Sequence, residues 1–172
     1  PLYHVGGLDL TATGTLNVGG SLVILRRFDP LPVLQAIQKE KPTNAWFAPT
    51  MVNALFQEPT FAQYDVSSIR FIIHGGEKMP MPLIRQVQKN FPNAWFADAY
   101  GLTETVSGDT FLAKDKMIVK IGSVGKPVFQ LRVRIVDDTA TNRQILECQT
   151  RAWKMQSRSA ASAAEALELL RG

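Results

Sequence analysis

Short apolar runs alternate with stretches of helical spacing through the first hundred residues of this chain. The apolar runs cover residues 21–26, 44–48, 69–73 and 93–97. They are too short for helices and are rich in β-branched or aromatic residues, as strands are. Because the stretches between them have helical spacing, the alternation predicts an α/β fold built on a doubly wound, mostly parallel sheet.

Prolines mark the expected starts of the helices. Asp29-Pro30 is typical of an N-cap followed by the first helical residue, and Pro49 opens a second helical stretch. Gly19-Gly20 is typical of a break after an earlier helix. We expect helices over residues 8–18, 30–41, 49–55 and 83–90.

One five-residue sequence, Asn-Ala-Trp-Phe-Ala, occurs at residues 44–48 and again at 93–97. Each copy follows a helical stretch and a proline, and each precedes a sharp turn. We interpret the two copies as comparable helix-to-strand entries into one sheet, each burying a Trp-Phe pair, and not as a tandem repeat.

The sequence changes character toward its C-terminus. Residues 131–136 alternate apolar and basic side chains, which predicts a half-exposed strand of a separate small sheet or barrel. Residues 149–172 are rich in Gln, Arg, Ser and Ala and end in a weakly amphipathic helical pattern. We expect two parts, 1–138 and a divergent 139–172. A frameshift is the preferred origin of the second part and a divergent natural tail the alternative.

From the composition we expect neither a membrane-spanning protein nor a nucleic-acid-binding protein. Among 172 residues, 45% are hydrophobic and 20% charged, which is ordinary for a soluble globular domain. No apolar run reaches the ~20 residues of a membrane span, and one cysteine fits a reducing compartment, so we expect a cytoplasmic protein. The net charge of +4 is not gathered in a basic block with aromatics, so no nucleic-acid partner is expected. A start at Pro1 instead of Met indicates a partial sequence.

Residues 98–105, Asp-Ala-Tyr-Gly-Leu-Thr-Glu-Thr, carry the chemistry suited to a metal-bound nucleotide. The ring of Tyr100 can stack on a purine, and Gly101 lets the backbone approach a ligand closely. Thr103 can donate to a phosphate oxygen, and Glu104 is a hard oxygen ligand suited to Mg²⁺. A strand end that turns at a glycine into a solvated helix start explains the same residues, and the residues alone leave both interpretations open.

The run YGLTET at residues 100–105 resembles the signature of the AMP-forming acyl-CoA synthetases, in the superfamily of luciferases and peptide-synthetase adenylation domains. Residues 1–8, 74–77 and 122–127 match further stretches of that family in its own order. The resemblance covers roughly residues 1–138. It implies an incomplete piece of the large N-terminal domain of an adenylate-forming enzyme.

The resemblance also implies roles for particular residues. Tyr100 stacks on adenine, the Ala99 backbone and Gly101 lie along it, and Asp98 accepts from its exocyclic amine. Thr103 bonds the α-phosphate and Glu104 holds Mg²⁺. The backbone of Gly75, Gly76 and Glu77 walls the adenine and acyl groups, and His4 lies beside the acyl-adenylate carbonyl. Val5, Gly6 and Gly7 line the mouth of the acyl tunnel. His74 has no ligand-spaced neighbour and is not expected to bind metal.

The implied reaction has two steps. A carboxylic acid, with a fatty acid favoured within the fatty-acyl and aryl-CoA ligase branch, reacts with ATP to give acyl-AMP and pyrophosphate. Coenzyme A then displaces AMP. A long-chain acid would allow peripheral membrane association.

The family's phosphate loop and C-terminal domain are not found in the sequence, so we expect no turnover from this chain alone. The alternatives are a non-catalytic fragment or pseudo-enzyme with weak nucleotide binding at most, and a stand-alone nucleotide-binding regulator.

Overall fold

The computed structural model describes residues 2–112, 116–120, 123–129, 131, 134–136, 138–152 and 158–171. The chain divides into two compact units, residues 1–125 and 126–172. The expectations for Gly122, and for residues 132–133 of the predicted strand 131–136, lie outside the described residues.

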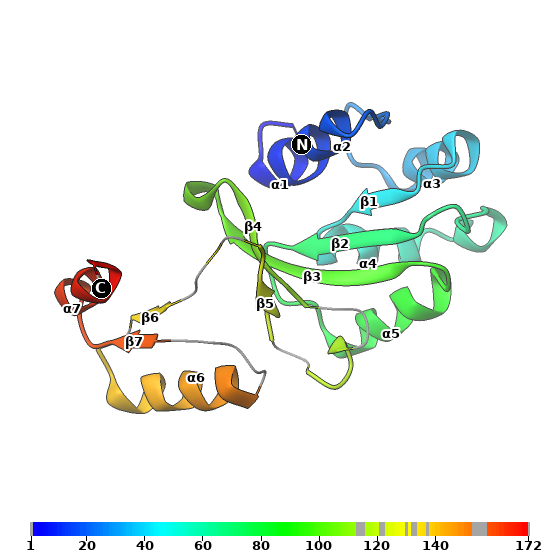
Figure 1. Ribbon diagram of the computed structural model, residues 1–172. Helices are drawn as coiled ribbons and strands as arrows, with labels where there is room; N and C mark the ends of the chain where they lie inside the picture. The colour runs from blue at the N-terminus through cyan, green and yellow to red at the C-terminus, as the bar shows by residue number, and fades with distance from the viewer. Residues whose placement is uncertain are drawn as a thin grey trace. The chain divides into compact units, whose positions relative to one another are not determined.

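A five-stranded sheet with the order β1-β2-β3-β4-β5 carries the fold (Figure 1). Strands β1 (Asn44–Trp46), β2 (Phe71–Gly75) and β3 (Trp95–Leu102) are parallel. Strand β4 (Ser107–Leu112) runs antiparallel to β3, and β5 (Lys126–Pro127) is the short last strand. The predicted α/β fold with a mostly parallel sheet is confirmed.

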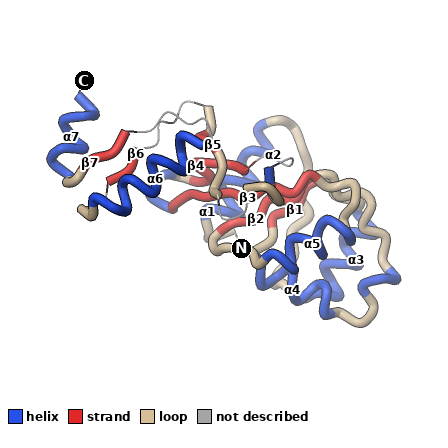
Figure 2. Tube along the Cα trace, turned by 90° about the horizontal axis from the view of Figure 1, so that it is seen from below, coloured by secondary structure: helices blue, strands red, loops and turns tan. Residues whose placement is uncertain are grey.

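Three helices lie on one face of the parallel strands (Figure 2). They are α3 (Pro30–Glu40), α4 (Pro49–Gln57) and α5 (Met81–Asn90), and a 3₁₀ turn η2 (Phe61–Gln63) follows α4. Each of the three helices has a proline in its first turn, where the missing N–H has no intrahelical partner to lose. The predicted starts of α3 and α4 are therefore confirmed, whereas α5 begins at Met81, two residues before its predicted start. Among the described residues, no helix has the length and apolar character needed to cross a membrane.

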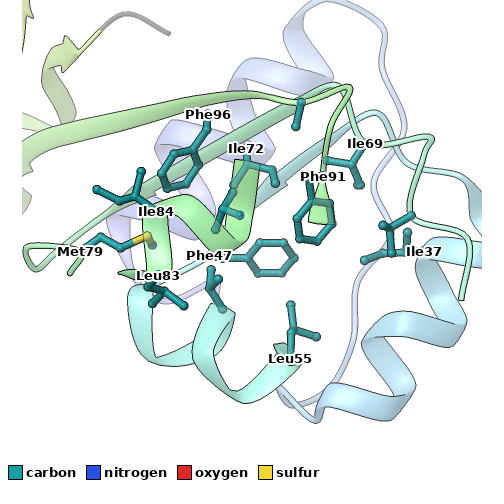
Figure 3. Close-up of a cluster of buried hydrophobic side chains, with 14 of the residues drawn as sticks. Ile37, Phe47, Leu55, Ile69, Ile72, Met79, Leu83, Ile84, Phe91 and Phe96 are labelled. Atoms are coloured by element: carbon teal, nitrogen blue, oxygen red, sulfur yellow. The ribbon is translucent and has the colours of Figure 1, made fainter. Parts of the chain in front are cut away.

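The hydrophobic core lies between these helices and the sheet (Figure 3). The sheet contributes alternate side chains, since successive residues of a strand point to opposite faces. Phe47, Ile72 and Phe96 point to the helices and are at most 6% exposed. The helices contribute Leu34, Ile37, Val52, Leu55, Ile84 and Val87. Burial of each large apolar side chain contributes about 1.5–3 kcal/mol, which fixes this face of the sheet.

The N-terminal segment is helical and packs against the opposite face of the sheet. It consists of α1 (Val5–Gly7), a π-helical stretch η1 (Leu8–Thr13) and α2 (Gly14–Asn17). Gly6 of this segment lies against the ring of Trp46 in β1. The predicted helix over 8–18 is thus confirmed with an earlier start, and it ends before Gly19, whose φ is +77°.

The prediction of a buried strand at residues 21–26 is wrong. The segment has no regular secondary structure, and Val23, Ile24 and Leu25 expose 41–61% of their surface. β-branched residues favour an extended backbone, but a strand exists only where a second strand completes its hydrogen bonds. No strand in the described part of the chain pairs with this segment.

The predicted end of the strand at residue 97 is also wrong, because β3 continues to Leu102. The unpredicted β4 pairs with this second half, from Asp98 opposite Leu112 to Leu102 opposite Ser107. Strand β2 begins at Phe71, two residues later than predicted, and continues to Gly75. The bounds of β2 and the carboxyl end of β3 therefore depend on the strands that pair with them, and not on local composition alone.

The second unit contains a separate two-stranded parallel sheet and two helices. Strand β6 (Arg134–Val136) pairs with β7 (Arg158–Ala160), as a separate small sheet was predicted. Helix α7 (Ala163–Arg171) confirms the predicted C-terminal helix, and α6 (Ala140–Ala152) was not predicted. A capping box begins α7: the Glu165 N–H donates to the Ser162 hydroxyl at 3.2 Å, and the Glu165 carboxylate accepts from the Ala161 N–H at 2.7 Å.

Candidate functional site

A hollow of about 230 Å³ opens at the carboxyl end of β2, beside the second half of β3. In open α/β sheets, ligands bind beyond the carboxyl ends of the strands. Ten of the residues singled out from the sequence line this hollow: His4, Val5, Gly6, Gly75, Gly76, Ala99, Tyr100, Gly101, Thr103 and Glu104. Segments that are about a hundred residues apart in sequence therefore meet at one place.

His4 builds one wall of the hollow by capping α1. Its Nδ1 accepts from the Gly6 N–H at 3.1 Å, and the hydroxyl of Thr11 donates to the Gly6 carbonyl at 2.8 Å. A neutral imidazole that accepts at Nδ1 carries its proton on Nε2. The cap therefore fixes the ring and leaves Nε2–H as a hydrogen-bond donor.

Trp46 forms the adjoining wall. Its ring lies 6.3 Å from the His4 ring, measured between centroids, and a Cβ placed on Gly6 would come within 3.1 Å of it. Gly6 is thus small because the indole of Trp46 packs against it. A larger residue at this position would push the two walls apart.

Two glycines form the floor, each for a different reason: Gly75 ends β2, and Gly76 directly follows it. Gly75 lies so close to β3 that an added Cβ would sit 2.5 Å from the Ala99 carbonyl oxygen. Gly76 has open space around it but a φ of +85°, which other residues rarely adopt. The backbone there is flat and bare, as a planar ligand requires.

Thr103 and Glu104 lie on a short 3₁₀ turn, η3 (Thr103–Thr105), that follows β3. The Leu102 N–H donates to the Thr105 hydroxyl at 3.1 Å, and that hydroxyl donates to the Asp109 carboxylate at 2.6 Å. Just before the turn, the register of β3 against β4 shifts between Tyr100 and Gly101, where Asp109 of β4 has no register partner in β3. These contacts hold the turn without using the side chains of Thr103 or Glu104.

Val106 closes this turn with a φ of +65°. A β-branched residue in the left-handed region is an outlier, and such strain costs on the order of 1–3 kcal/mol. The strained position directly follows the segment that carries Thr103 and Glu104.

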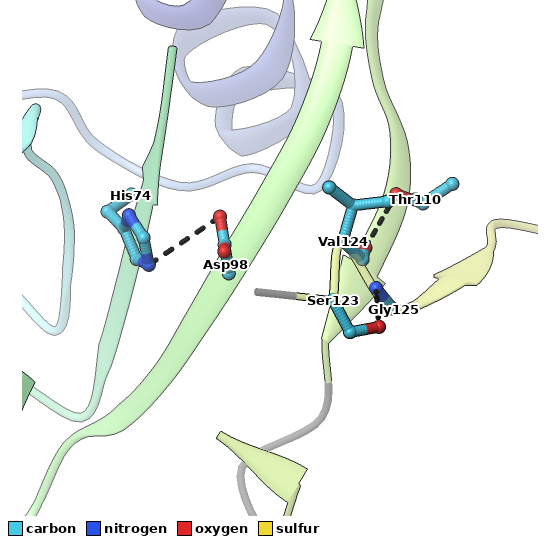
Figure 4. Close-up of polar contacts among 6 residues, drawn as sticks. All are labelled: His74, Asp98, Thr110, Ser123, Val124 and Gly125. Carbon is cyan, nitrogen blue, oxygen red and sulfur yellow. Dashed lines mark hydrogen bonds and ion pairs between the residues drawn. The ribbon is translucent and has the colours of Figure 1, made fainter. Parts of the chain in front are cut away.

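Three of the residues expected at the site do not line the hollow: Gly7, Glu77 and Asp98. Asp98 lies on the helix-covered face of β3, with Phe96, and its side chain is 21% exposed. Its Oδ1 is 3.6 Å from Nε2 of His74, whose side chain is fully buried (Figure 4). Burial lowers the pKa of His74 to about 4 and raises the pKa of Asp98 to about 6.

Sequence reasoning missed four lining residues: Leu10, Trp46, Leu102 and Gly108. Trp46 had only a partial signal: it lies in the middle of the predicted strand 44–48, and only the structure ends β1 at Trp46, at the edge where the carboxyl ends of the parallel strands meet. Leu102 lies inside the motif at residues 98–105 but was given no role. Leu10 and Gly108 had no signal, because their approach depends on the unpredicted β4 and on the packing of η1 against it.

Residues 123–125 of the matched segment pack against β4. The Thr110 hydroxyl of β4 donates to the Val124 carbonyl at 2.6 Å, and the Gly125 N–H donates to the Ser123 hydroxyl at 3.1 Å (Figure 4). Gly125 has a φ of +86°, and an added Cβ would overlap the Phe111 carbonyl. Gly125 therefore serves close backbone packing.

The donor set of the hollow fits a magnesium nucleotide. Glu104 contributes one carboxylate and Thr103 one hydroxyl, and the described residues contain no cluster of three metal-ligating side chains. Mg²⁺ is commonly held by one or two carboxylates together with phosphate oxygens of a bound substrate. A single glutamate therefore suits a metal that arrives with a nucleotide.

Comparison with known proteins identifies relatives of this chain. The sequence model of the family described as "AMP-binding enzyme" matches residues 1–145. The chain is 32% identical over 139 residues to 4-coumarate--CoA ligase 4 of Arabidopsis thaliana, a match covering 80% of this chain and 24% of that protein. The chain spans about a quarter of the length of the curated relatives it matches.

Solved structures show the same fold. O-succinylbenzoate coenzyme A synthetase from Bacillus subtilis, in complex with ATP and magnesium ion, aligns with a TM-score of 0.69 and 30% identity over 78% of this chain and 27% of that one. The inhibitor-bound N-terminal domain of FACL13 from Mycobacterium tuberculosis aligns with a TM-score of 0.68 and 31% identity, over 74% of this chain and 31% of that one.

Proposed function

The chain belongs to the family of AMP-binding enzymes, and from this membership we propose that it forms the adenylate-holding part of an AMP-forming acid–CoA ligase. The observation that carries the proposal is the hollow itself. It brings His4, Gly76, Tyr100, Thr103 and Glu104 together although the chain between them is long. One contiguous motif could occur by chance, whereas this convergence requires the fold.

The proposed ligand is an acyl adenylate formed from ATP and a carboxylic acid. Tyr100, 46% exposed, offers its face to the adenine, and Gly75 and Gly76 let the base lie against bare backbone. The Thr103 hydroxyl donates to an oxygen of the α-phosphate. The Nε2–H of His4, the one donor of its neutral imidazole, donates to the acyl carbonyl.

Glu104 is the residue proposed to hold magnesium. The ion supplies positive charge that offsets the negative charge gathering on the phosphate during acyl transfer. The Thr103 hydroxyl and the nearby backbone N–H groups stabilise the same charge as fixed dipoles. The overall reaction proposed for the whole protein is acid plus ATP to acyl-AMP and pyrophosphate, followed by displacement of AMP by the thiol of coenzyme A, which gives the acyl-CoA thioester.

The substrate proposed is an aromatic or fatty carboxylic acid. A fatty acid was favoured from the sequence, whereas the names of two similar proteins, 4-coumarate--CoA ligase and O-succinylbenzoate coenzyme A synthetase, point to aromatic acids. The indole of Trp46 beside His4 gives a flat ring against which an aromatic acid can stack. An aromatic acid is therefore the first candidate and a fatty acid the second.

A further part of the proposal concerns the chain by itself. It spans about a quarter of its relatives, so we expect it to bind an adenylate weakly and to show no ligase turnover. Residues 139–172 are proposed to diverge from the family, whose model ends its match at residue 145. CoA thioester formation by this chain from ATP, magnesium, coenzyme A and either 4-coumarate or a fatty acid would contradict the expected inactivity.

The test is a calorimetric titration of the chain with AMP and with two non-hydrolysable acyl-adenylate analogues, one aromatic and one fatty. Thr103→Val keeps the side-chain shape and removes the hydroxyl, so AMP affinity should fall about fivefold to tenfold, the value of one hydrogen bond. Thr43→Val, at an exposed threonine outside the hollow, is the matched control and should leave affinity unchanged. Absence of AMP binding, or equal losses in both variants, would overturn the proposed site.

A further inference from the structure

His74 is buried in a way that its role in the core does not explain. Its side chain is 0% exposed, and its ring stacks on Phe96 with centroids 4.6 Å apart and planes 14° from parallel. Neither ring nitrogen has a hydrogen-bond partner in the described part of the chain. A buried polar group left in this state costs about 1–3 kcal/mol, and an apolar ring would fill the same space without that cost. The imidazole is therefore a candidate for a functional role.

The group nearest to its Nε2 is the carboxylate of Asp98. Residues 74 and 98 are register partners in β2 and β3, so both side chains lie on the same face of the sheet. Nε2 and Oδ1 are 3.6 Å apart (Figure 4), and a shift of a few tenths of an ångström brings them to hydrogen-bonding distance. Polar contacts in ligand-free sites are often long and tighten when the ligand binds.

Burial sets the charges of this pair. With the pKa of His74 near 4 and that of Asp98 near 6, the imidazole is neutral at pH 7 and the carboxylate is ionised. A neutral imidazole has one N–H. When that proton is on Nε2, it points to Oδ1 of Asp98, and the contact becomes a hydrogen bond to a charged acceptor.

Asp98 does not itself line the hollow, but Ala99 and Tyr100, which follow it in β3, do. It lies two residues before Tyr100, and side chains two residues apart on a strand share a face about 7 Å apart. Gly75 and Ala99, the register partners that follow His74 and Asp98, line the hollow. A purine stacked on Tyr100 therefore lies along the direction in which the partly exposed carboxylate of Asp98 can reach it.

We propose that His74 is a positioning residue: its Nε2–H holds the Asp98 carboxylate in the orientation that accepts a hydrogen bond from the exocyclic amine of adenine. This inference rests on the proposed function, because it needs a nucleotide in the hollow. Asp98 touches the base, and His74 acts only through Asp98. The consequence is discrimination between bases, since hypoxanthine carries a carbonyl where adenine carries the amine.

The test compares AMP with inosine monophosphate, titrated into the chain by calorimetry at pH 7.5. The quantity measured is the dissociation constant of inosine monophosphate divided by that of AMP, which is the preference for adenine. His74→Phe keeps a flat ring against Phe96 but removes the N–H, so this ratio should fall about fivefold. His74→Gln retains an N–H donor and should keep the ratio within about twofold of wild type. Ile69→Val, a change elsewhere in the fully buried core, controls for lost stability and should leave the ratio unchanged.

The outcomes separate this inference from the proposed function. AMP binding with an unchanged ratio in His74→Phe overturns the inference alone. Absence of AMP binding by the wild-type chain overturns the proposed function and, with it, the role assigned to His74. Nitrogen NMR of His74 gives a readout without nucleotide: a proton on Nε2 at pH 7.5 supports the inference, and a proton on Nδ1 overturns it.

Discussion

The two copies of Asn-Ala-Trp-Phe-Ala lie in the same sheet, but their tryptophans have different surroundings. Trp46 of the first copy is partly buried and lines the hollow, whereas Trp95 of the second is 45% exposed and packs against Phe71 with ring centroids 5.1 Å apart. Phe47 and Phe96, one residue later, are both buried in the core. The expectation that each copy buries a Trp-Phe pair is therefore wrong for Trp95: the same five letters determine the face of each side chain but not its surroundings.

Register explains the difference. Asn44 and Trp95 are both partners of Phe71, so the second copy is displaced by two residues toward the amino end of the sheet. A displacement of two residues preserves the face, because side chains alternate with a period of two. Trp46 is level with Ala97 and reaches the ligand end, while Trp95 lies about 7 Å further back.

The largest expected effect tests whether the two phenylalanines are equivalent. Phe47→Ala and Phe96→Ala should each lower the free energy of unfolding by about 3–5 kcal/mol, because each leaves a cavity in the same core. Urea unfolding followed by circular dichroism measures the loss. Phe129→Ala, at a phenylalanine that is 90% exposed, is the control and should change stability by less than about 0.5 kcal/mol. A difference of more than about 2 kcal/mol between the two core variants would show that register also changes the core environment.

The next effect concerns the pH dependence of stability at the residue that follows each copy. Pro49 follows the first copy and cannot titrate, whereas Asp98 follows the second and can. The folded protein keeps the Asp98 proton up to a pKa near 6, against 3.8 when unfolded, so this group lowers stability as pH rises from about 4 to 6. His74 has the opposite sign: its pKa is near 4 when folded and 6.5 when unfolded, so stability rises over about the same range. In the wild type the two contributions, each roughly 2–3 kcal/mol, nearly cancel.

Single substitutions should expose each contribution. His74→Phe leaves Asp98 alone, so its stability relative to wild type should fall as pH rises from 4 to 6. Asp98→Asn leaves His74 alone, so its relative stability should rise over that range. Urea midpoints measured at several pH values give both slopes, and all other titrating groups are shared with the wild type. Slopes of the same sign in the two variants would contradict the assignment.

The smallest effect compares the tryptophans directly. Trp46→Phe should weaken binding of an aromatic acyl-adenylate analogue about fivefold, because the smaller ring loses about 1 kcal/mol of contact. Trp95→Phe is the matched control in the second copy and should change affinity by less than about twofold. Calorimetry measures both. A larger loss in Trp95→Phe would place the acyl group on the other part of the sheet.

Local sequence features that act within a few residues were sufficient for much of the fold. Prolines in the first turns of α3, α4 and α5 fix helix starts because they remove an N–H that has no partner there. The order of apolar and helical stretches was enough for the α/β fold with a mostly parallel sheet. The carboxyl-end rule and the family motif together named ten residues that line the hollow.

Features that depend on distant partners could not be predicted. Residues 21–26 have the composition of a strand but no strand beside them, and β3 extends past residue 97 only because β4 pairs with it. The meeting of His74 and Asp98 follows from the register of β2 against β3. No local pattern specifies that register.

The sequence by itself determined the order of the helices α3, α4 and α5 and of the parallel strands β1, β2 and β3, and the alternation of side chains between the two faces of each strand, because these follow from periods of 3.6 and two residues. Only the tertiary structure decided how far each strand extends along its neighbours. That alignment depends on hydrogen bonds and core contacts between segments far apart in the chain. It places Trp46 at the hollow, leaves Trp95 exposed and puts Asp98 beside His74.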